Sequence, residues 1–204
     1  MANHKAGTKR VSLSRLEIHP ADESRWADVE RLFGLRGACA GCWCMFWRRP
    51  RREWEAAKGT GNKRALRRLI SSGEEPGILA YWRDEPVGWC ALAPREAYGY
   101  LERSRLLRPV DDRPVWSVSC LFVARPFRRK GISVRLLRAA AAHAAGRGAR
   151  ILEGYPSEPG SERAPDAFIW LGTAAAFRRA GFHEAARRSP TRPIMRRHLR
   201  AAGS

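Results

Sequence analysis

The sequence lacks any long apolar run and any segment typical of export. No stretch approaches the roughly 18 consecutive apolar residues that a membrane-spanning helix needs. The opening MANHKAGTKR has no apolar core of the kind found in signal peptides. The five cysteines are an odd number, which argues against a framework of paired disulfides. We therefore expect a cytoplasmic protein with reduced thiols and no membrane partner.

Lysine and acidic residues are scarce beside arginine. The chain has 5 lysines, 34 arginines and 20 acidic residues, which gives a formal net charge of +19. Such a charge is compatible with a polyanionic partner such as nucleic acid. The arginines are spread over the whole length rather than gathered in one block, and alanine and glycine are abundant, which is typical of a GC-rich coding bias. Nucleic acid is therefore a compatible partner that the pattern does not favour.

Two familiar phosphate-binding loops are absent, and so is any internal repeat. The sequence contains neither G-x-G-x-x-G nor G-x-x-x-x-G-K-[ST], which excludes those two nucleotide-binding patterns. What is present is a chain of 204 residues that is 44% apolar, with 8 Trp and 7 Phe, enough for one domain with a substantial core. We expect residues 1–12 to be a disordered tail and residues 13–204 to form a single domain. A homodimer is an open alternative for its assembly.

Hydrophobic periodicity predicts a mixture of strands and helices. Two of the strands are joined by the short turn at 83–86 and form an antiparallel hairpin, while a helix at 132–145 connects two others as a crossover. Asn62 is expected to cap one helix and Gly181 to end the last one. The pattern indicates an α+β fold with a mixed, mostly antiparallel sheet of about six to seven strands and helices on both faces. The expected strands are 15–19, 77–82, 87–93, 115–123, 150–155, 182–188 and 193–199, and the main helices are 20–33, 62–72, 132–145 and 170–180.

A basic turn with one glycine joins the strand at 115–123 to the helix at 132–145. It reads Arg-Arg-Lys-Gly-Ile-Ser over residues 128–133. The first N–H groups of a helix have no internal partner and carry partial positive charge. Gly131 allows close backbone approach and Ser133 adds a hydroxyl, so the turn favours a pyrophosphate-like anion. A plain strand-to-helix turn with solvated arginines is the alternative.

The same six residues resemble the [QR]-x-x-G-x-[GA] signature of the GNAT superfamily, the acyl-CoA-dependent N-acetyltransferases, with Ser133 at the last position. Residues 177–182, Phe-Arg-Arg-Ala-Gly-Phe, resemble the F-x-x-x-G-F element that closes the family's fold. The predicted element order is similar to that of the family from about residue 13 to 199. The stretches CWCMFW, PVGWCALAPR, VWSVSCLFV and EGYP resemble one widespread bacterial branch.

The resemblance implies acetyl-CoA as co-substrate and a place for each of its parts. Backbone N–H groups from about Arg129 to Val134 are expected to hold the pyrophosphate, and the exposed edge of the strand at 115–123 to pair with the pantetheine arm. That strand and the one at 150–155 are expected to splay apart around the thioester. The implied cofactor-binding residues are Leu121, Phe122, Val123, Arg128, Arg129, Lys130, Gly131, Ile132, Ser133 and Val134.

The sequence departs from the family at the positions that move protons. Phe177 stands where many members have a tyrosine that protonates the leaving thiolate, and Ser117 where some have a glutamate base. Trp170 replaces an asparagine that contacts CoA. The remaining candidates are Glu153 as base and Tyr155 as acid, with ordinary structural hydrogen bonding as their alternative.

Two other polar side chains of the strand at 115–123 are weaker candidates. A covalent acetyl group on Cys120 is disfavoured. Members of the family usually transfer the acetyl group directly, and a buried cysteine usually behaves as a small apolar residue. Ser119 could donate a hydrogen bond.

A segment rich in cysteine and tryptophan lies between residues 34 and 61. Its C-x-x-C pair at Cys39 and Cys42, followed by Cys44, has zinc-like spacing. A second ligand pair is missing, so we predict no metal site. The resemblance places this segment at the acceptor pocket, with Trp43, Phe46 and Trp47 as candidate substrate-binding residues. Packing in the core is the alternative for these aromatic rings.

The function that follows is transfer of an acetyl group from acetyl-CoA directly to a primary amine of an unidentified small-molecule or protein acceptor. Two alternatives remain at the level of sequence. One is an RNA-associated basic protein, or an acetyltransferase acting on aminoacyl-tRNA. The other is a non-catalytic acyl-CoA sensor, because the usual acid and base positions are empty.

Overall fold

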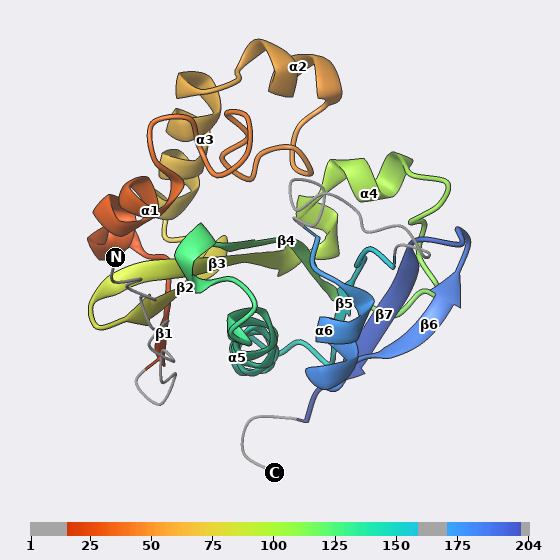
Figure 1. Cartoon of the computed structure of the whole chain (residues 1–204). Coiled ribbons are helices and arrows are strands. Elements are labelled where there is room, and N and C mark those ends of the chain that lie inside the picture. Colours follow the sequence, from red (N-terminus) through yellow and green to blue (C-terminus); the bar gives the residue numbers. More distant parts are fainter. Residues whose placement is uncertain (1–15, 159–170, 201–204) are drawn as a thin grey trace, which may run out of the picture.

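The computed structural model describes residues 16–158 and 171–200, where the strands form one seven-stranded mixed sheet in the order β1-β2-β3-β4-β5-β7-β6 (Figure 1). Only β4 and β5 run parallel, and every other neighbouring pair is antiparallel. The α+β fold expected from the sequence is therefore confirmed. The predicted tail at 1–12 and Trp170 lie outside the described residues. The strands are β1 (Leu16–Pro20), β2 (Gly77–Trp82), β3 (Glu85–Pro94), β4 (Trp116–Val123), β5 (Ile151–Gly154), β6 (His183–Arg187) and β7 (Pro193–His198).

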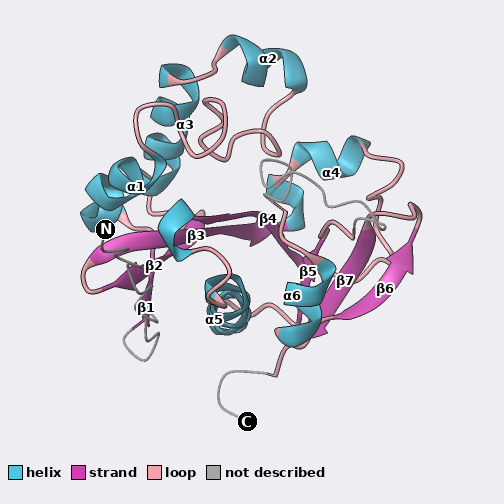
Figure 2. Ribbon diagram, in the orientation of Figure 1, coloured by secondary structure: helices cyan, strands magenta, loops and turns pink. Residues whose placement is uncertain are grey.

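Helices cover both faces of the sheet (Figure 2). The helices α1 to α4 lie on one face, and α5 and α6 lie on the other, with α5 against β2, β3 and β4. The α-helices are α1 (Trp26–Phe33), α2 (Arg51–Ala56), α3 (Thr60–Ser71), α4 (Gly99–Arg103), α5 (Ile132–Gly146) and α6 (Ala174–Arg179), and the 3-10 turns are η2 (Glu23–Arg25), η3 (Arg95–Ala97) and η4 (Arg125–Phe127).

Three helix starts differ from those expected, and the first is that of α1, which begins at Trp26 rather than at residue 20 because the 3-10 turn η2 precedes it. Asn62 does not cap α3, because the helix begins two residues earlier at Thr60. Asn62 is instead buried, and its Nδ2 donates to the carbonyl oxygens of Gly41 (3.2 Å) and Trp54 (3.2 Å). The last helix, α6, begins at Ala174 behind a Thr173 cap, and Gly181 follows it with φ +88° as predicted.

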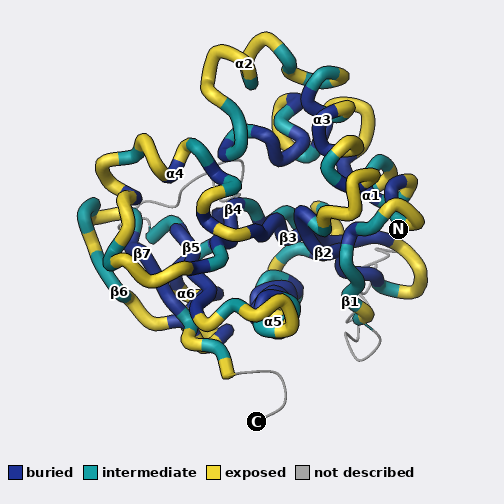
Figure 3. The backbone as a smooth tube through the Cα atoms, turned by 180° about the vertical axis from the view of Figure 1, so that it is seen from behind, coloured by how far each residue is buried: buried dark blue, intermediate teal, exposed yellow. Residues whose placement is uncertain are grey.

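The buried side chains form three clusters rather than one, and Figure 3 shows that the buried segments lie mainly in the strands and in α5. One lies between the sheet and α5 with α6. The second lies on the opposite face, where α1, α3 and the segment at 34–50 cover β2 to β4. The third joins η3 and α4 to β5 and β7. The side chains of β4 contribute to the first two clusters, so this strand lies at the centre of the molecule.

No helix in the described ranges is both long enough and apolar enough to span a bilayer.

Candidate functional site

The parallel strands β4 and β5 part after a short contact. Their pairing covers only residues 116–118 of β4, and it ends where Val118 faces Gly154. On the other edge of β4, Ala91 pairs with Cys120 and Leu92 with Val118, so Ser119 is an extra residue that bulges out of the ladder. Bulges bend a strand and redirect its side chains. Beyond Ser119 the strand therefore keeps β3 on one side and has no β-strand partner among the described residues on the other.

Phe177 fills the base of the gap between the two strands. It is fully buried. A methyl group added at Gly154 would lie 2.2 Å from its ring, and one added at Gly172 would lie 2.7 Å from Leu121 and 3.1 Å from the Phe177 ring. The two glycines therefore make room for this ring. Phe177 acts here as an apolar wedge and offers no proton.

The N-terminus of α5 presents the anion-binding features that the sequence predicted. Gly131 precedes the helix in the left-handed conformation (φ +82°), and a methyl group there would meet nothing within 4 Å. Within the described chain, the backbone N–H groups of residues 129–133 donate to no carbonyl. Val134 differs, because its N–H donates to the Gly131 carbonyl at 3.1 Å. The amide of Val134 is therefore used by the helix and is not among the available donors.

Side chains of the turn surround this group of amides. The Arg128 Nε donates to the Val123 carbonyl at 3.1 Å, and the Lys130 ammonium lies 5.6 Å from the centre of the Phe127 ring. The Ala124 N–H donates to the Val87 carbonyl of β3. Because the backbone groups of successive strand residues point to opposite sides, the N–H and carbonyl of Val123 point away from β3. The open edge of β4 and the free amides of α5 thus meet at Arg128.

A buried ion-pair network lies behind the gap. The Glu153 carboxylate is fully buried; its Oε1 accepts from Arg95 Nη1 (3.2 Å) and its Oε2 accepts from Arg196 Nε (2.7 Å). Arg196 also donates to Asp111 at 2.7 Å. Arg113 and Arg196 together hold the pKa of Asp111 well below its usual range. Glu153 is therefore fixed between two guanidinium groups.

Tyr155 belongs to the same network. Its hydroxyl donates to Glu153 at 2.7 Å and accepts from Arg95 at 2.8 Å, and it lies 2.9 Å from the Ser117 hydroxyl. Burial first, and then the charge of Glu153, raise the pKa of Tyr155 well above its usual value. The base and acid roles of Glu153 and Tyr155 stay predictions, and the geometry gives both side chains a complete set of structural partners.

The segment at 34–50, called the Cys/Trp loop below, packs its rings inward. Trp43 is 2% exposed and stacks on Trp26 at 6.1 Å between ring centroids, while Trp47 lies 6.1 Å from the Tyr155 ring. Phe46 is half-buried against Trp47 and Trp54. Trp43 therefore belongs to the core, and the substrate-binding role of these three rings stays a prediction.

The thiols of this loop differ in exposure and in their partners. Cys39 is exposed, whereas Cys44 is buried and its Sγ accepts from Trp89 Nε1 at 3.1 Å. Contact with the Cys120 thiol, followed by burial, raises the pKa of Cys44 well above its usual value. In the ranges 16–158 and 171–200, no group of three or more His, Cys, Asp and Glu side chains could hold a metal ion.

Sequence reasoning missed the residues that complete the network. Arg95, Arg196 and Asp111 received no role, although Arg95 and Arg196 are only 5% and 2% exposed. The alternation of the strand at 193–198 could have indicated Arg196, because a charged residue there shares a face with Ile194. Nothing in the local sequence around Arg95 indicates burial.

A family model described as the acetyltransferase (GNAT) family matches residues 43–181. A search of curated proteins gave no match. Solved structures with the same fold include a GNAT-family acetyltransferase from Streptococcus agalactiae, with a TM-score of 0.55 and 9% identity over 93% of this chain and 99% of that one.

Two further structures show the same overall similarity. The PaiA N-acetyltransferase from Thermoplasma acidophilum, solved in complex with coenzyme A, has a TM-score of 0.52 and 14% identity over 90% of this chain and 99% of that one. An aminoglycoside 6′-acetyltransferase of type Ii has a TM-score of 0.52 and 14% identity over 91% of this chain and 99% of that one. At these identities the likeness concerns the fold.

Proposed function

The chain belongs to the acetyltransferase (GNAT) family, and we propose that it transfers an acetyl group from acetyl-CoA directly to a primary amine. The observation that carries this proposal is the row of unbonded N–H groups at residues 129–133, next to the open edge of β4. A similar fold in Thermoplasma acidophilum binds coenzyme A, which supports the choice of donor.

The residues present fit the diphosphate and pantetheine parts of such a donor. Amides 129–133 lie at the positive end of the α5 dipole, and Gly131 leaves the approach to them open. Arg128 and Lys130 add positive charge beside them. The outward-facing amide and carbonyl of Leu121 and Val123 suit strand-like pairing with an extended amide arm.

The chemistry divides between the donor and the protein. Bound acetyl-CoA supplies an activated thioester. The chain aligns the reactants, holding the acyl group at the gap where β4 leaves β5. Among the outward-facing N–H groups of β4, those nearest the gap are placed to donate to a developing oxyanion. An amine entering from the α1–α4 face must lose a proton, and a chain of water molecules is one route for it.

The cofactor proposal is tested with two glycine variants. Gly131→Glu places a carboxylate among the amides and is expected to abolish acetyl-CoA binding in calorimetry, because like charges repel there. Gly148→Glu is the matched control. Gly148 follows the other end of α5, has φ +84° and also has nothing within 4 Å of an added methyl group. Normal CoA affinity in folded Gly131→Glu would defeat the proposal.

A non-catalytic acyl-CoA sensor is the second candidate. It is favoured by one observation, namely that Phe177 replaces the proton donor while Glu153 and Tyr155 are both held in the buried network. A screen of acetyl-CoA against an amine library, read as release of free thiol, separates the two candidates. Turnover of any amine eliminates the sensor.

A further inference from the structure

Several buried side-chain polar atoms of the described chain have no hydrogen-bond partner, and three of them belong to Arg48, Tyr98 and Ser119. The Arg48 Nη2, the Tyr98 hydroxyl and the Ser119 hydroxyl form no regular hydrogen bond within the described chain. Tyr98 and Ser119 are fully buried, and the Arg48 side chain is only 10% exposed. Buried polar groups without partners are rare in folded proteins and cost free energy, so each such group requires an explanation.

Arg48 packs against the Tyr98 ring, and Ser119 is a neighbour of the Tyr98 hydroxyl. The Arg48 guanidinium carbon lies 5.1 Å from the centre of the Tyr98 ring. Burial raises the pKa of Tyr98 to about 12, while the Arg48 charge and the nearby Ser119 hydroxyl act in the opposite direction. The Tyr98 and Ser119 oxygens are therefore close, but neither completes a hydrogen bond of good geometry. The backbone ties the segments together, because Tyr100 N–H donates to the Trp47 carbonyl at 3.0 Å.

The position of the cluster relates it to the reaction. Ser119 is the bulged residue of β4, at the point where that strand leaves β5. Arg48 comes from the Cys/Trp loop and Tyr98 from the turn between η3 and α4, both on the face opposite α5. An acceptor that enters from this face to reach the thioester meets these three side chains.

The charge of the cluster is not balanced. The only carboxylate near Arg48 in the described chain is that of Glu74, with 3.8 Å between Nη1 and Oε2, and Glu74 is 53% exposed. By contrast, the guanidinium groups of Arg95 and Arg196 share the buried Glu153 at hydrogen-bonding distance. A buried cation with a weak counter-ion, packed on a tyrosine whose hydroxyl has no regular partner in the described chain, is arranged for an anion.

We propose that Arg48, Tyr98 and Ser119 bind the carboxylate of the acceptor, so that the substrate amine is an amino acid or another amine with a carboxylate on a nearby carbon. This inference rests on the proposed acetyl transfer. One guanidinium and two hydroxyls suit a monoanion, because a dianionic phosphate would leave a buried charge uncompensated.

The first test compares acceptors that differ only in the carboxylate. Thiol release is measured with a set of amino acids, their methyl esters and the corresponding decarboxylated amines. We expect kcat/KM to be about 10- to 100-fold higher for the free acids, because a hydrogen bond to a charged group contributes that much selectivity. In Arg48→Met this ratio is expected to fall to about one. Arg49→Met, which removes the same charge one residue along, keeps the ratio.

The second test measures stability and needs no turnover. Tyr98→Phe and Ser119→Ala remove oxygens without regular partners, so we expect their Tm values to equal or exceed that of the wild type. Tyr155→Phe and Ser117→Ala remove hydrogen-bonded oxygens from the adjacent network and are expected to lower Tm. Equal losses in the two pairs would show that the cluster is structural and would overturn the inference.

A third measurement separates this inference from the proposed function. The Tm of the CoA-bound protein is recorded with N-acetyl amino acids and with the corresponding N-acetyl amides. A shift by the acids alone, lost in Arg48→Met, supports the carboxylate site even if no amine is acetylated. If amines are acetylated without preference for the acids, acetyl transfer stands and the carboxylate site is wrong. If the acids give no shift, the site is also wrong.

Discussion

A single buried carboxylate, Glu153, holds residues from distant parts of the chain together. It joins β5 to Arg196 on β7 and to Arg95 at the end of β3, and through Tyr155 it reaches Ser117 on β4. Two guanidinium groups balance this carboxylate and Asp111. A buried ion-pair network of this kind stabilises the fold only while every member is present, because removing one member leaves another charge buried and unpaired.

Glu153→Gln therefore tests whether this residue is structural. The substitution keeps the shape but leaves Arg95 and Arg196 facing a neutral amide, so we expect a loss of about 3 to 5 kcal/mol in the free energy of unfolding. Urea denaturation followed by tryptophan fluorescence measures it. If Glu153 instead accepts the proton of the amine, the variant keeps wild-type stability and loses kcat.

At the scale of elements, the Cys/Trp loop depends on α3 for its conformation. Ala40, Trp43 and Cys44 all have positive φ, which is uncommon for residues with side chains. Such a backbone persists only where surrounding contacts over-determine it. Asn62 of α3 supplies two of these contacts, through the carbonyls of Gly41 and Trp54. The loop that carries Arg48 is thus held in its conformation by a hydrogen bond from α3.

Asn62→Ala is expected to loosen this loop. It leaves two carbonyls without their donor in a buried setting, which costs about 1 to 3 kcal/mol for each group that water cannot reach. Limited proteolysis should then cut within residues 34–59, while CoA affinity stays unchanged because α5 is untouched. Asn62→Asp, which keeps the size but removes the donor, should behave like the alanine variant. A variant as resistant as the wild type contradicts the assigned role.

Local pattern predicted the elements and the turn before α5 that carries the proposed backbone amides. The strands, the hairpin at 83–84 and the start of α5 follow from period, turn residues and a single glycine, all of which act over a few positions. The position of the amides at 129–133 could be predicted from the sequence for the same reason. The role of Asn62 was predicted wrongly, because an asparagine that caps a helix and one that forms buried hydrogen bonds with a loop look the same in the sequence.

The side-chain half of the site could not be predicted from local pattern. Arg95 and Glu153 are 58 residues apart, and Arg196 and Asp111 are 85 apart. A pair of opposite charges at such separation is indistinguishable from two surface charges until the sheet order is known. The same holds for Arg48, Tyr98 and Ser119, which meet only because the Cys/Trp loop folds over β4.

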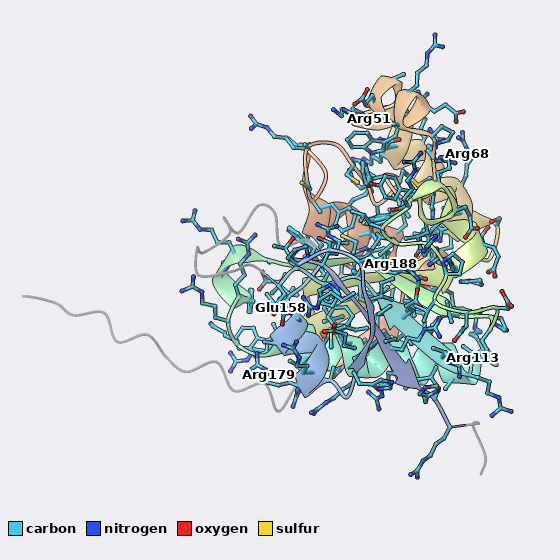
Figure 4. The ribbon with its side chains drawn as sticks, turned by 90° about the vertical axis from the view of Figure 1, so that its right-hand side faces the viewer. Arg51, Arg68, Arg113, Glu158, Arg179 and Arg188 are labelled. Carbon is cyan, nitrogen blue, oxygen red and sulfur yellow. The ribbon has the colours of Figure 1, made fainter. Side chains whose placement is uncertain are left out.

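At the scale of the whole molecule, the arginines are distributed and largely engaged. Figure 4 shows Arg51, Arg68, Arg113, Arg179 and Arg188 on well-separated elements around the molecule. Three arginine side chains donate to backbone carbonyl groups: Arg138 to that of Arg179, Arg197 to that of Ala180 and Arg188 to that of Arg108. Arginine side chains used in this way link elements of the fold to one another. Along the sequence the arginines form no single block, which weighs against the RNA-associated alternative.

Acid stability reports on this network of arginines and carboxylates. Contacts with arginine hold the pKa of Asp111, Glu158 and Glu184 below their usual values in the folded protein, with Arg113 acting first on Asp111 and Arg187 first on the two glutamates. A folded pKa below the unfolded one means that the stabilisation is complete above the unfolded pKa of about 4 and is lost as the pH falls through the folded values. The contribution of these carboxylates to Tm is therefore expected to stay level from about pH 7 to 5 and to fall below about pH 4.

Glu158 allows this expectation to be assigned to one residue, because its carboxylate joins Arg178 of α6 to Arg187 of β6. Glu158→Gln should lower Tm at pH 7, and its curve should converge with that of the wild type at acid pH, where Glu158 itself becomes protonated. Glu85→Gln, at an exposed position at the start of β3, is the control and should leave the curve in place. Parallel curves for wild type and Glu158→Gln at all pH values would show that this carboxylate does not link α6 to β6 in solution. Convergence would show that one ionised group joins the closing helix of the fold to its edge strand.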